Sequence, residues 1–145
     1  MATLLAQPNG YALEILLVQL DGKTELAFQD MPDTEFAGEV ALAKCVGNTL
    51  LFALQYGSPY RKGVLIRKNP NDHAVERLYF AEKSLPGWLY LNERHMLLVF
   101  LNEGYESNKK YLVYRYVAGE GQPSESEATD RRPAQEGYSV IRLMP

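Results

Sequence analysis

Part of the sequence is repeated within the chain, and this internal repeat is the feature that most constrains its fold. A shift of 47 positions, from residue 50 to residue 97, places Leu50–Leu54 on Leu97–Leu101 without a gap. The same shift places Val64–Ile66 on Tyr111–Val113 and aligns a glycine in the loop between. Each copy reads as an apolar strand, a polar loop and a second apolar strand. Repeats with a period of about 20–50 residues are typical of folds built from one supersecondary unit, although two unrelated β-hairpins can also look alike by chance.

Short apolar or alternating segments, separated by turn residues, run along most of the chain. A weaker third copy of the hairpin pattern consists of Leu16–Leu20, the turn pair Asp21-Gly22, and Leu26–Phe28. We expect strands at 11–20, 25–28, 39–46, 49–56, 64–68, 75–82, 88–91, 96–101, 109–117 and 138–143. Only 35–45 also fits a helix, because Phe36 and Val40 would share one helical face with Ala43.

This density of strands predicts an all-β fold, an antiparallel meander of repeated hairpins. The chain is too short for a propeller of four or more blades, so we expect an incomplete propeller-like arrangement or a sandwich. A length of 145 residues indicates a single domain over 1–145. Within it, the polar stretch at about 118–137 is rich in glycine, proline and charge, which predicts a flexible excursion.

Charge and hydropathy exclude two classes of partner. The net charge is −3, whereas a nucleic-acid-binding surface needs a basic face. The longest apolar stretches, such as 11–20 and 96–101, are far shorter than the ~20 residues that span a bilayer. We therefore expect no nucleic-acid partner and no membrane span.

The sequence gives no good candidate for a catalytic, cofactor-binding or metal site. The single cysteine, Cys45, lies in an apolar-rich segment, and a free cysteine is commonly a small buried hydrophobe. His73 and His95 lack the nearby histidine or cysteine that a zinc site requires. No glycine-rich phosphate loop opens a helix. We expect a protein that is not an enzyme and has no cofactor.

The N-terminus leaves the compartment open. Met1-Ala2-Thr3 is followed by neither the basic segment nor the long apolar run of a secretory signal, so the chain reads at face value as cytoplasmic. A periplasmic domain whose export signal had been trimmed would look the same.

Loop tyrosines are the clearest recognition signal. The chain has ten tyrosines and one tryptophan, and Tyr56, Tyr60, Tyr105 and Trp88 fall in or beside expected loops. Such rings offer large, stiff contact areas and are enriched in binding surfaces. Strand tyrosines are explained by β-sheet propensity alone.

The segment Lys83-Ser84-Leu85-Pro86-Gly87-Trp88 is predicted to be a stiff hairpin projection with Ser84 near its tip. A narrow tip with a hydroxyl group could enter an enzyme cleft and hydrogen-bond a catalytic histidine. The alternative is an ordinary connection, in which Trp88 packs into the core and Ser84 only caps the turn.

From about residue 11 to residue 117, these hairpins and the serine-bearing loop resemble the periplasmic immunity proteins of type VI secretion peptidoglycan-amidase effectors. The resemblance implies a non-enzymatic partner of an amidase with a Cys–His site, whose cleft a hairpin serine would occlude. Ser84 matches that serine, with Ser107 as second choice, and Leu85, Trp88 and the loop tyrosines would supply the surrounding contacts. The alternative is a propeller-like protein-interaction domain of an intracellular assembly.

Overall fold

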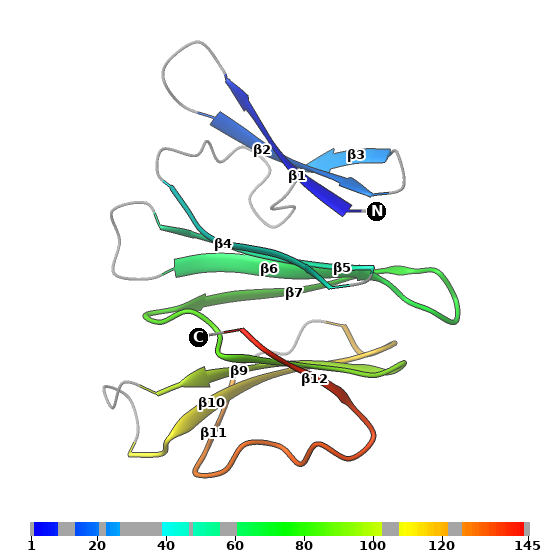
Figure 1. Cartoon of the computed structure of the whole chain (residues 1–145). Coiled ribbons are helices and arrows are strands. Elements are labelled where there is room, and N and C mark those ends of the chain that lie inside the picture. The colour runs from blue at the N-terminus through cyan, green and yellow to red at the C-terminus, as the bar shows by residue number, and fades with distance from the viewer. Residues whose placement is uncertain are drawn as a thin grey trace.

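The chain folds into three antiparallel β-sheets that are stacked as layers in the computed structural model (Figure 1). The structure describes residues 2–8, 14–20, 23–26, 39–46, 48–55, 61–102, 108–121 and 126–143. The first sheet has the order β1-β2-β3, from strands β1 (Ala2–Pro8), β2 (Glu14–Leu20) and β3 (Lys23–Leu26). The second is a meander of β4 (Glu39–Val46), β5 (Thr49–Gln55), β6 (Arg61–Lys68) and β7 (Val75–Glu82). The third has the order β11-β10-β9-β8-β12, from β8 (Trp88–Leu91), β9 (His95–Leu101), β10 (Tyr111–Val117), β11 (Glu127–Thr129) and β12 (Ser139–Arg142).

The prediction of an all-β fold of antiparallel hairpin strands is confirmed, and the arrangement is sandwich-like. The repeat corresponds to two meanders with the same strand order, β4 to β7 and β8 to β11. Their registers differ by two residues, because Leu50 pairs with Ile66 whereas Leu97 pairs with Arg115 instead of Val113. A slip of two residues keeps every side chain on the same face of its sheet, since successive side chains alternate. The aligned leucines therefore occupy equivalent faces in the two sheets.

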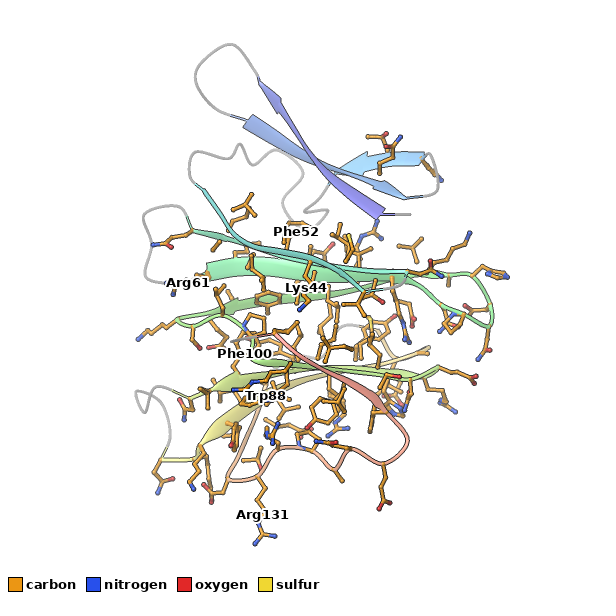
Figure 2. All side chains as sticks on the ribbon, in the orientation of Figure 1. Lys44, Phe52, Arg61, Trp88, Phe100 and Arg131 are labelled. Atoms are coloured by element: carbon orange, nitrogen blue, oxygen red, sulfur yellow. The ribbon has the colours of Figure 1, made fainter. Side chains whose placement is uncertain are left out.

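The main core lies between the second and third sheets (Figure 2). Alternate residues of β5 to β10 point into it, and its buried members are Leu51, Ala53, Leu65, Leu78, Phe80, Leu89, Met96, Leu98, Phe100, Leu112 and Tyr116. The other faces of the central strands are buried as well. On β5, Leu50, Phe52 and Leu54 are no more than 3% exposed, on the side of the sheet where β1 lies (Figure 1). Burial on both faces explains why β5 and β9 are continuous apolar runs instead of alternating ones.

The outer face of the third sheet is covered by the chain between β11 and β12. The hydroxyl of Tyr90 donates a hydrogen bond of 2.9 Å to the Pro133 carbonyl, and the Arg132 guanidinium lies 4.5 Å from the centre of the Trp88 ring. Burial raises the pKa of Tyr90 above its ordinary value, with the Arg132 charge opposing this rise. The described part of the polar stretch at 118–137, predicted as a flexible excursion, thus includes strand β11 and contacts the sheet.

The helical alternative for 35–45 is wrong for the residues that the structure describes. Residues 39–46 form β4, which pairs with β5 from Glu39 opposite Gln55 to Val46 opposite Thr49. A β-bulge between Val40 and Leu42 interrupts the alternation of side chains, so the period-2 signal of this strand is weak in the sequence.

The hairpin predicted around Ser84 is also wrong. β7 pairs with β6, and β8 pairs with β9 and β12, so these two strands belong to different sheets. Residues 83–87 are therefore the connection from the second sheet to the third. Pro86 and Gly87 are buried in this connection, and the Gly87 amide donates a hydrogen bond to the Val99 carbonyl.

Gly63 lies in the core at a position where the absence of a side chain leaves room for the ring of a neighbour. It lies opposite Ala53 on one side and Phe80 on the other, and the Phe80 ring covers it. A Cβ at this position would clash with the Phe80 ring and with the backbone carbonyl of Phe52. We expect Gly63→Ala to lower the free energy of unfolding by about 1–3 kcal/mol, measured by urea denaturation.

Gly121 offers a matched control, because a Cβ there meets no atom, although its positive φ of 78° still disfavours alanine. Overpacking at Gly63 should lower the dispersion of the core methyl signals in NMR spectra, whereas Gly121→Ala should not. A Gly63→Ala protein as stable as the wild type would contradict this packing.

Candidate functional site

The chain connections singled out in the sequence start and finish at one end of the two-sheet body, which we call the loop end. Its described residues are Gln55, Arg61, 82–87, Leu101, Asn102 and 108–111, at the left in Figure 1. Two hydrogen bonds tie them together. The Arg61 guanidinium donates from Nη1 to the Lys83 carbonyl at 2.6 Å, and Ser84 Oγ donates to the Leu101 carbonyl at 3.2 Å. The strand ends that precede and follow three separate connections are thus held side by side.

Ser84 is partly exposed at the loop end, but it does not lie at the tip of a projection. Its hydroxyl is a donor to the end of β9, and the oxygen keeps lone pairs that can accept a further hydrogen bond. Next to it, the carboxylate of Glu82 accepts a hydrogen bond of 2.6 Å from the Tyr114 hydroxyl. Ser84 therefore ties the connection to the third sheet, and the bond between Glu82 and Tyr114 joins the two sheets.

Leu85 and Trp88 make contacts inside the protein. Leu85 is partly buried against the main core. Trp88 packs on the outer face of the third sheet, where its ring lies edge-on to Tyr111 with the centroids 5.8 Å apart and is covered by Arg132. These contacts favour the alternative interpretation of residues 83–88, an ordinary connection whose side chains pack against the sheets.

Four of the predicted contact residues, Tyr56, Tyr60, Tyr105 and Ser107, lie outside the described residues. The strand ends that flank them are described. The connection at 102–110 begins with two hydrogen bonds of Asn102, from its backbone amide to the Lys110 carbonyl at 2.9 Å and from its side-chain amide to the Lys109 carbonyl at 2.8 Å. β9 and β10 therefore form a true hairpin, unlike β7 and β8.

The opposite end, which we call the turn end, carries a buried polar network that sequence reasoning missed. Arg67 and Glu76 face each other across β6 and β7, with Nε and Oε1 2.9 Å apart and both side chains no more than 6% exposed. The Asn69 amide donates to the same carboxylate oxygen at 3.0 Å. Burial, followed by the charge of Glu76 and a hydrogen bond to it, raises the pKa of Tyr116 above its ordinary value, so this phenol stays protonated at neutral pH.

This network reaches the turn between β8 and β9. Arg67 donates from Nη1 to the Asn92 carbonyl at 2.6 Å and from Nη2 to the Glu93 carbonyl at 3.2 Å. The Asn69 amide adds a bond of 3.1 Å to the Glu93 carbonyl. Arg67 therefore fixes the turn of the third sheet from a strand of the second.

A groove of about 630 Å³ lies at the turn end, lined by residues 91–95 and 137–139. His95 borders it, with its ring edge-on to Tyr138 at a centroid distance of 6.1 Å. Neither residue stood out in the sequence as part of a site.

The other groups considered for chemistry are dispersed. Cys45, expected to be a small buried hydrophobe, is exposed on the edge strand β4. His73 has a positive φ of 62° in the turn between β6 and β7. Among the described ranges, no three histidine, cysteine, aspartate or glutamate side chains gather as metal ligands, and no helix is long and apolar enough to cross a membrane.

Comparison with known proteins gave no matching family model, no similar curated protein and no similar solved structure. The loop end and the groove therefore have to be interpreted from their own geometry.

Proposed function

We propose that this chain is a non-enzymatic inhibitor that binds a bacterial cell-wall amidase through its loop end and occludes the active-site cleft of that amidase. The observation that supports this function is the convergence of three connections on one end, held by the bonds of Arg61 and Ser84. Loops gathered on a rigid β-scaffold are a common binding surface, because the scaffold fixes the loop bases while the tips vary.

Within this proposal, Ser107 takes the role first given to Ser84. The Ser84 hydroxyl donates to Leu101 inside the protein, whereas Ser107 belongs to the connection of a true hairpin. Tyr105 accompanies it in the same connection, and Tyr56 and Tyr60 belong to the connection after β5. Aromatic anchors around a small polar residue are the side chains from which we expect most of the affinity. The proposal includes a periplasmic location, where a cell-wall amidase acts.

The test is inhibition of a Cys–His peptidoglycan amidase encoded beside this chain. We expect Ser107→Arg to raise the inhibition constant by at least about 30-fold, the effect of losing one hot spot, because a bulky charge cannot enter a narrow cleft. Ser84→Arg should also weaken inhibition, since it crowds the base of the same surface.

The matched control is Ser139→Arg, which places the same charge at the turn end and should inhibit as well as the wild type. Full inhibition by both loop-end variants would contradict the proposed surface. Absence of any inhibition by the wild-type protein would contradict the proposed partner. Binding of a different, intracellular protein through the loop end would favour an interaction domain of an intracellular assembly instead.

A further inference from the structure

The groove at the turn end presents polar groups that the fold itself does not use. It is a shallow depression of about 630 Å³ that is open to solvent. It lies at the opposite end of the sheets from the loop end, so it is independent of the function proposed above.

The hydrogen bonds around His95 decide which nitrogen of its neutral ring would carry the proton. Its Nδ1 lies 3.2 Å from Asn92 Oδ1, and that oxygen also accepts hydrogen bonds from the backbone amides of Arg94 and His95. The Asn92 side-chain nitrogen donates to the Gly137 carbonyl at 3.2 Å, which fixes the orientation of the amide. Because Oδ1 can only accept, Nδ1 of the neutral ring must be the donor. Nε2 is then an acceptor, and no described residue donates to it.

Two further groups on the rim are available to a ligand. Arg94 is exposed, and its guanidinium has no partner in the described part of the chain. The Ser139 hydroxyl is exposed at the start of β12 and also has no hydrogen-bond partner among the described residues. The Glu93 carboxylate also lies exposed on the lining and accepts a hydrogen bond of 3.4 Å from the Asn71 amide, which leaves its negative charge in place.

The rim is held rigid from three directions. Arg67 fixes the carbonyls of Asn92 and Glu93, and the Ala118 amide donates to the Arg94 carbonyl at 2.7 Å. Asn92 ties the same turn to Gly137. A ligand would therefore meet groups that are already in place, which lowers the entropic cost of binding.

We propose that this groove binds an extended acidic peptide. A guanidinium and an imidazole acceptor that line the same groove fit a ligand that offers both a carboxylate and an N–H donor, as an aspartate or glutamate residue in a peptide does. The neighbouring strand supports the same class of ligand. β12 pairs with β8 on one side, and no described strand pairs with its other side. An extended peptide can add to such an open edge through its backbone, beginning at Ser139.

The test uses a fluorescein-labelled peptide of about eight residues in which glutamate and valine alternate, with binding followed by fluorescence anisotropy. We expect the matched glutamine–valine peptide to bind at least about tenfold more weakly, the loss that corresponds to one charge-assisted hydrogen bond. Arg94→Gln should weaken binding of the glutamate peptide by a similar factor. His95→Phe should weaken it as well, because the acceptor Nε2 is lost while a ring of similar shape remains.

Arg131→Gln is the matched control, because it removes an exposed arginine outside the groove and should leave the affinity unchanged. In NMR spectra of the wild-type protein, shifts caused by the glutamate peptide should be confined to residues 91–95 and 137–142. Equal affinity for the two peptides, equal losses in Arg94→Gln and Arg131→Gln, or shifts centred on the loop end would each overturn the proposal. So would selective binding of a neutral oligosaccharide in place of the acidic peptide.

Discussion

Replacing Arg67 with methionine should lower the free energy of unfolding by about 3–5 kcal/mol. The substitution removes the charge opposite Glu76 but leaves that carboxylate buried, with the Asn69 amide and Tyr116 as its remaining partners in the described part of the chain. It also removes the donors to the carbonyls of Asn92 and Glu93 in the neighbouring sheet. Urea denaturation at neutral pH measures the loss.

Arg115→Met is the matched control for this prediction. Arg115 also faces a glutamate, Glu127, but at 3.6 Å and with both side chains substantially exposed, so we expect a loss of less than about 1 kcal/mol. In the double variant Arg67→Met/Glu76→Leu, both buried charges are absent, and part of the lost stability should return. Equal losses in Arg67→Met and Arg115→Met would show that the buried pair does not stabilise the fold.

The strands could be predicted because a strand that is buried on both faces needs apolar residues at successive positions. β5 and β9 are buried on both sides, which requires the continuous apolar runs from which the repeat was recognised. The register was not predictable in the same way. A slip of two residues leaves each side chain on its original face, so the aligned residues satisfy either pairing.

The hairpin around Ser84 could not be distinguished locally from a connection between two sheets. Lys83–Gly87 contains the serine, proline and glycine that serve both, and the difference depends on which strands pair with β7 and β8. Those partners, β6 and β9, lie elsewhere in the sequence. The same long-range pairing places Ser84 beside the end of β9. Nothing in the local sequence around Ser84 indicates this contact.

The sequence contains a partial indication of the buried polar network around Arg67 and Glu76. Arg67 and Glu76 stand opposite each other about the turn that begins at Asn69, so a hairpin model alone places two opposite charges face to face. Their burial depends on the turn at Asn92, which belongs to the other sheet. The groove beside His95 has the same origin, because it forms where this turn meets the chain before β12. The two segments that line it, 91–95 and 137–139, lie far apart in the sequence, and composition does not link them.

Replacing Phe100 with alanine should cost about 3–5 kcal/mol, because this ring fills the space between the second and third sheets. Its side chain is fully buried, with the Phe80 ring centroid 5.4 Å away and that of Tyr114 5.5 Å away. Leu101→Ala is the matched control on the same strand. Leu101 is 43% exposed, so its truncation should change the unfolding free energy by less than about 0.5 kcal/mol.

The Phe100 prediction can be tested further through Gly63. The clash in Gly63→Ala pushes the Phe80 ring, and Phe100 is the nearer of the two aromatic rings, Phe100 and Tyr114, that limit where it can move. In Phe100→Ala the ring has a cavity to enter, so the combined variant should lose less stability than the sum of the two single losses. Residues in contact typically show coupling energies of about 0.5–3 kcal/mol. Strict additivity would mean that Phe80 does not transmit the strain, and the row from Gly63 through Phe80 to Phe100 would not be the packing unit that joins the two sheets.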